Sequence, residues 1–235
     1  AGRGLALQAV RASLEGAGEG SSVSVAAHVA GIGWQDAASA PSYAGTVGQG
    51  RAVQAVRVSL SGPVSDSYDV WYRVHAAGYG WLGWAKDGEA AGTEGLGGQA
   101  EALQVVLVEK GGDAPSPGAP AELSVPSLSL RAHVSGVGWQ PAVGNGGTAG
   151  TTGQSRAVEA IAAEVSSPVS GGLSYSAHVS GVGWQDEVSG GAVAGTTGQG
   201  RAVECVKMRL TGDLSEYYDV WYRAYVQDYG WLGWA

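Results

Sequence analysis

The sequence has no Phe, one Cys, one Met and few charged residues, and these shortages exclude several classes of protein. The lone Cys205 permits neither a disulfide within the chain nor a cysteine-based metal cluster. The 21 Asp and Glu outnumber the 13 Lys and Arg, and the formal charge of −8 argues against nucleic acid as a partner. No apolar run approaches the ~20 residues of a membrane span, so we expect no membrane insertion. We expect no cofactor and no metal.

The residues that are abundant indicate a globular protein rich in turns. The 235 residues include 41 Gly, nine Trp and ten Tyr, and 44% of the chain is hydrophobic against 14% charged. This length is enough for one large or two ordinary domains, each with a core of its own. So much Gly without a collagen period predicts many tight turns and therefore many short strands.

One segment recurs five times along the chain. It reads "AAHVAGIGWQD" at residues 26–36 and "SAHVSGVGWQD" at residues 176–186, and it is followed by "AGT", a Gly-Gln turn and an apolar strand. Self-similarity of this kind decides the fold class before any local pattern does. Each copy carries one Trp, here called the repeat Trp, and the five are Trp34, Trp81, Trp139, Trp184 and Trp231.

The repeats group into two modules. A Trp-rich variety, "YDVWYR…GWLGWA", occurs at residues 68–85 and again at 218–235, and a Pro/Gly/Ser-rich stretch follows its first copy. We therefore predict a first module over residues 1–109, a linker over 110–126 and a second module over 127–235. Each would contain three repeats, the first module lacking its opening half-repeat and the second its closing half.

The local patterns predict an all-β fold. Residues 173–179 alternate apolar and polar, as in a half-buried strand. The segments "VQAVRVSL" and "VECVKMRL" alternate with a break in phase near the middle, which indicates a β-bulge there. A short hairpin is expected to turn at residues 189–191. Repeats of several strands in groups of three favour a pseudo-threefold, β-trefoil-like module, with a β-prism as the alternative. A five-bladed propeller fits less well because the linker interrupts it.

The unit "V-x-Y-x-A-H-V-x-x-x-G-W-Q … A-G-T-T-G-Q-x-R-A-V-E" resembles the clostridial hydrophobic repeats with a fixed Trp, known as ChW repeats. The resemblance covers nearly the whole chain apart from the linker. It implies a secreted or cell-wall-associated protein of a Gram-positive bacterium, with modules for adhesion or for binding polysaccharides or proteins. It supplies no catalytic residues. The chain departs from the pattern where "GWLG" replaces "GWQ" at Trp81 and Trp231, and where Tyr225 replaces the His.

The residues shared by all repeats are expected to be structural. Trp carries a large hydrophobic surface, and its presence in every copy favours a core position for the repeat Trp over a sugar-binding platform. Cys205 occupies a position that is Ala or Val elsewhere, so we expect a small core residue there. We expect the His at one repeat position to make a structural hydrogen bond and not to bind a metal. Its four copies are His28, His75, His133 and His178.

The extra aromatic residues of the Trp-rich repeats are the candidate binding site. If Val70 and Tyr72 face the core, Trp71 faces outward, and exposed Trp usually marks a contact. Such side chains would line a shallow sugar-binding groove; the alternative is that they pack against the linker or the next module. The candidate ligand-binding residues are Trp71, Trp84, Asp87, Trp221 and Trp234.

The sequence therefore predicts a non-catalytic extracellular module that binds polysaccharide or cell-wall glycan, with a structural or protein-adhesion array as the alternative. A catalytic carboxylate pair finds little support, because Asp36, Asp186 and Glu187 lie in variable parts of the repeat. The complementary half-repeats, residues 1–14 and 218–235, either belong to a longer array or exchange strands to complete one repeat.

Overall fold

The chain folds into two units, one ending at Val125 and the other beginning at Pro126. The structure is a computed structural model that describes residues 2–116 and 118–235. The other two residues, 1 and 117, fall in the predicted first module and in the predicted linker, and they lie outside the described residues.

Strands dominate both units, and the helices of the described residues are two short segments, which confirms the all-β prediction. These strands form several small sheets, and none of the sheets in the described part of the chain closes into a barrel. The trefoil and the prism therefore stay predictions.

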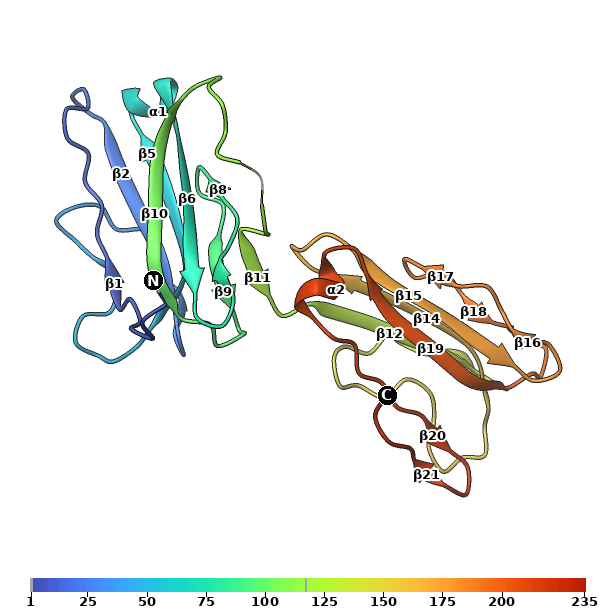
Figure 1. Ribbon diagram of the computed structural model, residues 1–235. Helices are drawn as coiled ribbons and strands as arrows, with labels where there is room; N and C mark the ends of the chain where they lie inside the picture. The colour runs from blue at the N-terminus through green and yellow to red at the C-terminus, as the bar shows by residue number, and fades with distance from the viewer. Residues whose placement is uncertain (1, 117) are drawn as a thin grey trace. The chain divides into compact units, whose positions relative to one another are not determined.

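The first unit contains three sheets (Figure 1). One runs in the order β10-β6-β7 with β8 beside β6, one in the order β11-β9-β5-β2-β3, and β1 pairs with β4. The predicted linker contributes β11, which lies parallel to β9. The elements are β1 (Ala9–Val10), β2 (Ser22–Val29), β3 (Gly33–Trp34), β4 (Ala44–Gly45), β5 (Val53–Ser61), α1 (Pro63–Ser67), β6 (Tyr68–Ala76), β7 (Gly80–Trp81), β8 (Ala85–Lys86), β9 (Ala91–Glu94), β10 (Ala100–Glu109) and β11 (Glu122–Ser124).

The second unit is built in the same way. Its sheets run β13-β12-β14-β18 and β16-β15-β17, the latter with β19 on the other edge of β15, and β20 pairs with β21. The elements are β12 (Ser127–Val134), β13 (Gly138–Trp139), β14 (Val158–Ser166), β15 (Gly172–Val179), β16 (Gly183–Trp184), β17 (Val188–Ser189), β18 (Ala194–Gly195), β19 (Val203–Thr211), α2 (Leu214–Tyr217), β20 (Tyr225–Val226) and β21 (Gly230–Trp231).

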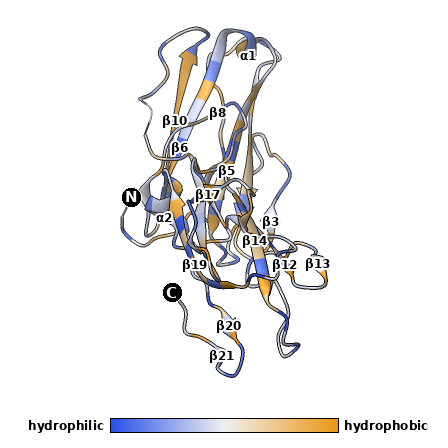
Figure 2. Ribbon diagram, turned by 90° about the vertical axis from the view of Figure 1, so that its right-hand side faces the viewer, coloured by the Kyte–Doolittle hydropathy of each residue, from blue (hydrophilic) through white to orange (hydrophobic). Residues whose placement is uncertain are grey.

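Each complete repeat is a long antiparallel hairpin with short strands beside it. The hairpins are β2 with β5, β6 with β10, β12 with β14, and β15 with β19. Every second side chain of a long strand faces the core, as Val25, Ala27 and Val29 do in β2, and orange segments interrupted by blue or pale ones mark these strands in Figure 2. The repeats are numbered 1 (residues 22–61), 2 (68–109), 3 (127–166) and 4 (172–211), with a partial repeat 5 (218–235).

The predicted β-bulge is present in each complete repeat, and it lies near the start of the second long strand instead of near its middle. In repeat 1, His28 pairs with Ala55 and Val29 with Val53, so one residue between them has no partner across the hairpin. The register shifts at the same place in the other three complete repeats. The bulge residues are Gln54, Glu101, Glu159 and Glu204.

Neighbouring repeats are joined through the "AGT" strand. β9 of repeat 2 pairs with β5 of repeat 1, and β18 of repeat 4 pairs with β14 of repeat 3. Gly195 makes the second contact possible, since a Cβ on it would lie 2.6 Å from Cα of Ala160. The predicted turn at residues 189–191 forms, since the amide of Ala192 donates to the carbonyl of Ser189 at 3.1 Å. The predicted pairing of its two flanking strands is wrong, because β17 pairs with β15 while β18 pairs with β14.

The N-terminal segment of the first unit contacts both of its repeats. The amide of Val53 donates to the carbonyl of Leu7 at 2.7 Å, and the amide of Leu7 donates to the carbonyl of Ala100 at 2.8 Å. Leu7, Val53 and Ala100 occupy the same position of the repeat pattern, just before the bulge.

Candidate functional site

The repeat Trp side chains lie on the outer face of the hairpins. Each sits on a two-residue strand, directly opposite a His of the first long strand in repeats 1 to 4 and opposite Tyr225 of the short strand β20 in repeat 5. The two rings meet edge to face, with centroids between 5.4 and 5.6 Å apart. The pairs are His28–Trp34, His75–Trp81, His133–Trp139, His178–Trp184 and Tyr225–Trp231.

This placement overturns the expectation that the repeat Trp fills a core position. Trp81, Trp184 and Trp231 are 36%, 43% and 42% exposed, and Trp34 and Trp139 are half-buried. The core instead consists of the inward-facing Val, Ala and Tyr side chains of the long strands. The repeat Trp belongs to the surface because it packs on a His that alternation turns away from the core.

The His of the motif also approaches the bulge residue. His Nδ1 lies 3.2 Å from Glu101 in repeat 2, 3.0 Å from Glu159 in repeat 3 and 3.1 Å from Glu204 in repeat 4. His75, His133 and His178 therefore each lie beside one ring and one carboxylate, whereas His28 has the neutral Gln54 at its bulge. Within the described residues, no three His, Cys, Asp or Glu side chains come together as metal ligands.

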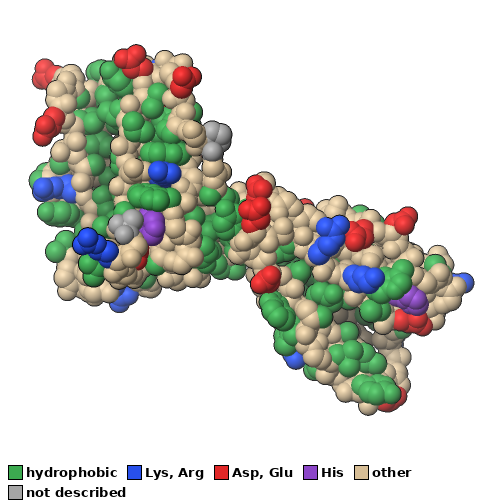
Figure 3. Space-filling view, in the orientation of Figure 1, with side chains coloured by type: hydrophobic (Ala, Val, Ile, Leu, Met, Phe, Trp, Pro, Cys, Tyr) green, Lys and Arg blue, Asp and Glu red, His purple; other side chains and the backbone are tan. Residues whose placement is uncertain are grey.

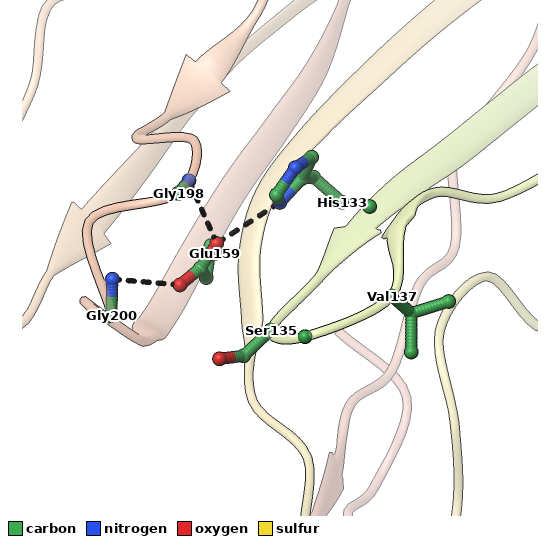
Figure 4. A pocket seen from close by; sticks show the side chains of 8 residues that line it. His133, Ser135, Val137, Glu159, Gly198 and Gly200 are labelled. Carbon is green, nitrogen blue, oxygen red and sulfur yellow. Dashed lines mark hydrogen bonds and ion pairs between the residues drawn. The ribbon is translucent and has the colours of Figure 1, made fainter.

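Glu159 joins repeat 3 to repeat 4. Its carboxylate is 2% exposed and accepts the backbone N–H of Gly198 at 3.0 Å and of Gly200 at 2.8 Å, with His133 on its other side (Figure 4). The Gly198 N–H above all, then that of Gly200 and the nearby His133, lower the pKa of Glu159. A pocket of about 370 Å³ opens beside these groups.

An equivalent contact forms in the first unit. Glu101 accepts the N–H of Gly2 at 2.7 Å, and Gly2 occupies the same place in its turn as Gly198. The turn of one repeat is therefore held by the bulge carboxylate of another. The turn glycines Gly198 and Gly200 line the pocket beside Glu159 because the carboxylate binds their N–H groups. The pocket is therefore part of the contact between repeats 3 and 4.

Sequence reasoning missed two recurring polar contacts. In the first, a bulge Glu accepts backbone N–H groups of a turn in another repeat. In the second, the side-chain oxygen of the Gln in "GWQ" accepts the N–H of the Gly in "AGT". Both recur at a fixed repeat position, which was the available signal. The Gln–Gly pairs are Gln35–Gly45, Gln140–Gly150 and Gln185–Gly195.

A cation covers every repeat Trp. The charged group lies 4.0 to 4.8 Å from the ring centroid, which is within cation–π distance. The pairs are Arg57 on Trp34, Arg73 on Trp81, Arg131 on Trp139, Lys207 on Trp184 and Arg223 on Trp231.

Repeat 2 concentrates these groups on the outer face of β6. Trp71 and Arg73 point outward there, while Val70, Tyr72 and Val74 are buried. The guanidinium of Arg73 lies 4.8 Å from the ring of Trp81 and 4.8 Å from that of Trp84. Lys86, opposite Trp71 in the sheet, lies 5.5 Å from the Trp71 ring. We call Trp71, Arg73, Trp81, Trp84 and Lys86 the Trp–Arg strip.

The space-filling view shows this kind of surface. Over β6 and β10, hydrophobic side chains form a green stripe that contains blue Lys and Arg groups and a purple His (Figure 3). The contacts of Arg73 with the Trp84 ring and of Lys86 with the Trp71 ring place the two predicted Trp residues on one face. Arg73 and Lys86 were missed because sequence pattern does not indicate which cation stacks on which ring.

Asp87 adjoins the strip, and its carboxylate is already engaged. Its Oδ1 accepts the N–H of Val70 at 2.8 Å, and it lies within 4.0 Å of Lys86 and Lys110. Hydrogen bonds from Lys110 and then Lys86 lower the pKa of the neighbouring Asp69 to about 2. These two carboxylates and two ammonium groups balance in charge, and Arg73 forms no ion pair with either carboxylate.

Repeat 5 presents the corresponding residues with greater exposure. Trp221 is 66% exposed and Trp234 is 56% exposed. The guanidinium of Arg223 lies 4.6 Å from the rings of both Trp231 and Trp234, as Arg73 does between its two rings. The chain therefore contains the Arg between two Trp twice.

The remaining candidates have other surroundings. Cys205 is exposed, so the expected core position is wrong: among the described residues no "AGT" strand pairs with β19, whereas β9 pairs with β5 at the equivalent Ala55. Asp36 and Asp186 are exposed. Glu187 accepts a hydrogen bond from Arg209 at 2.6 Å.

These features define a class of protein: an all-β tandem-repeat module that displays Trp–cation pairs on its surface. The chain belongs to the Clostridial hydrophobic W (ChW) family, whose family model matches residues 28–62, 75–109, 133–166 and 178–212, as the sequence predicted. Searches of curated proteins and of solved structures found no match. In the part of the chain that the structure describes, no helix has the length and apolar character needed to cross a bilayer.

Proposed function

We propose that the protein is a non-catalytic module that binds polysaccharide or cell-wall glycan through the Trp–Arg strip. One observation carries this proposal: three partly exposed Trp rings lie on one outward sheet face with hydrogen-bonding groups between them. Aromatic rings offer an apolar face to the C–H side of a sugar, and fixed polar groups between them bond its hydroxyls.

The array of repeats supports binding by weak sites in series. Repeat 5 repeats the arrangement of repeat 2, so one polymer strand has two equivalent sites to occupy on each chain. Linked sites raise the overall affinity through effective concentration when the ligand reaches both. ChW repeats are associated with surface or secreted proteins, and we propose a secreted or cell-wall location.

The test is calorimetric titration of the chain with bacterial wall polysaccharides, plant glycans and mucin. We expect saturable binding that falls at least tenfold in Trp71→Ala combined with Trp221→Ala. Tyr43→Ala is the matched control, because Tyr43 is 53% exposed and lies outside the strip. Absence of binding to every glycan, with a correctly folded chain, would contradict the proposal.

The second candidate is a protein-adhesion array, and the apolar surface of β10 favours it. Val105, Val106 and Leu107 are 50%, 38% and 41% exposed along one strand, and exposed apolar residues in a row indicate a contact surface. Under this alternative, Val105→Ser with Leu107→Ser abolishes association between chains, whereas the Trp variants do not affect it. Sedimentation analysis over a range of concentrations distinguishes the two.

We propose a pseudo-threefold arrangement for a complete module. The hydrogen bonds that join Leu7 to Val53 and to Ala100 support it, because three copies of one repeat position then meet at one place. The "AGT" strand of each repeat would pair with the preceding repeat, as β9 does with β5.

Strand exchange between residues 1–14 and 218–235 also stays a proposal. The described hydrogen bonds of residues 222–235 run within that segment, whereas residues 7–10 pair in the first unit. Exchange between chains predicts a dimer that dissociates when residues 218–235 are deleted, as sedimentation would show.

A further inference from the structure

The cation over the repeat Trp comes from either of two facing positions. These positions lie directly opposite each other on the outer face of the long hairpin, one on each strand. In each complete repeat one position holds the cation and the other holds a neutral residue. The facing pairs are Ala26 with Arg57, Arg73 with Gln104, Arg131 with Ala162, and Ser176 with Lys207.

Each complete repeat therefore has a positive charge over its repeat Trp, although the strand that supplies the charge differs between repeats. The charge comes from the first strand in repeats 2 and 3 and from the second strand in repeats 1 and 4, yet it lies within 4.8 Å of the Trp ring every time. In a chain with a net charge of −8, such regular placement of a scarce residue type indicates a shared role.

Packing on the ring leaves the guanidinium of Arg73 with unused donors. Its Nε donates to Gln104 at 2.7 Å, and within the described residues its other nitrogens form no hydrogen bond and no ion pair. Other Arg residues of this chain are engaged differently: Arg51 donates to the carbonyl of Ala30, and Arg209 pairs with Glu187. The guanidinium of Arg73 is therefore placed beside two Trp rings with its terminal N–H groups free to donate.

A guanidinium fork is suited to the two oxygens of a carboxylate or a phosphate. The Trp rings on both sides of Arg73 are suited to the apolar face of a sugar. We propose that the Trp–Arg strip recognises an acidic polysaccharide, with Arg73 and Arg223 bonding the anionic group of the sugar between two Trp rings. This inference rests on the proposed glycan-binding function and names the class of glycan.

The net charge of the chain opposes a polyanion at long range. At physiological ionic strength the Debye length is ~8 Å, so distant carboxylates are largely screened while a direct contact at Arg73 is less affected. A chain with a net negative charge can therefore bind a polyanion through direct contacts with local cations, without a favourable long-range field.

The experiment compares two polymers with the same sugar backbone, one with free carboxylates and one with neutral methyl esters. Polygalacturonate and its fully methyl-esterified form are titrated into the chain by calorimetry at physiological ionic strength, with poly(glycerol phosphate) and hyaluronate as further polyanions. We expect a polyanion to bind and the methyl ester to bind at least tenfold more weakly. Arg73→Gln with Arg223→Gln should reduce polyanion affinity at least tenfold, and Arg73→Lys with Arg223→Lys should restore part of it.

Arg3→Gln is the control for loss of a positive charge elsewhere, compared with Arg73→Gln alone, because Arg3 is exposed and lies over no Trp ring among the described residues. It should leave the affinity unchanged, and circular dichroism should show that all variants are folded. A preference among the polyanions assigns the recognised group to carboxylate or to phosphate.

Two results would overturn the inference, and each removes a different part of the account. Equal affinity for the acidic polymer and its methyl ester, unaffected by the Arg variants, would remove acidic recognition and leave glycan binding in place. Failure of all polymers in the calorimetric panel, neutral and acidic, would remove the proposed function itself.

Discussion

At the scale of single residues, the outward His of each hairpin decides where the repeat Trp lies. Alternation turns His75 away from the core, and the Trp81 ring packs edge to face on it. The sequence shows that the Trp recurs but not which way it points, because a two-residue strand has no period to read. The same alternation on a nine-residue strand correctly predicted that Trp71 lies on the outer face.

Glu159 gives a prediction for the pH dependence of stability. Its pKa in the folded chain lies below that of an unfolded Glu, ~4.3, so its stabilising contribution is complete above that pH and is lost as the pH falls through the folded pKa. We expect Glu159→Gln to lower the melting temperature at pH 7 and to flatten its dependence on pH between 7 and 3.

Thermal unfolding followed by circular dichroism measures this effect. Glu204→Gln is the control, since Glu204 occupies the equivalent bulge of repeat 4. Its side chain is 49% exposed and accepts no backbone N–H in the described structure. The same change of melting temperature with pH in the Glu159 variant and in the wild type would contradict the account.

At the scale of elements, the chain is a series of long hairpins tied by short strands. The hairpins and their bulges were predictable, because alternation over eight or nine residues and a break in it are visible in the sequence. The partners of β17 and β18 were not, since each has two residues and pairs with a different long strand. Those pairings depend on where the neighbouring repeat lies, which local pattern does not contain.

Gly195 tests the tie between repeats 3 and 4. Its φ is +115°, and a Cβ there would lie 2.6 Å from Cα of Ala160, so Gly195→Ala strains the backbone and separates β18 from β14. We expect a loss of stability above the roughly 1–3 kcal/mol of backbone strain alone. Gly190→Ala is the control, because Gly190 also has a positive φ, +58°, and open space around it. Chemical denaturation should show a clearly smaller loss for the control; equal losses would contradict the tie.

At the scale of the whole chain, one surface unit is used five times. The repeats, the all-β class and the ChW family were evident from the sequence, because the repeated motif carries all three. The Trp–cation pairs were not, because the cation moves between two strands and only the pairing register shows that both positions face the same ring. The chain therefore acts, in this account, as an array of small aromatic sites.

Nuclear magnetic resonance of the nine indole N–H groups during titration with polygalacturonate tests this account most directly. It predicts that the resonances of Trp71, Trp81 and Trp84, with those of Trp221, Trp231 and Trp234, shift with saturation. The resonance of Trp34, whose indole N–H donates to Glu94, should shift least. Uniform small shifts across all nine, or none under saturating polymer, would contradict the claim that the Trp–Arg strip binds glycan.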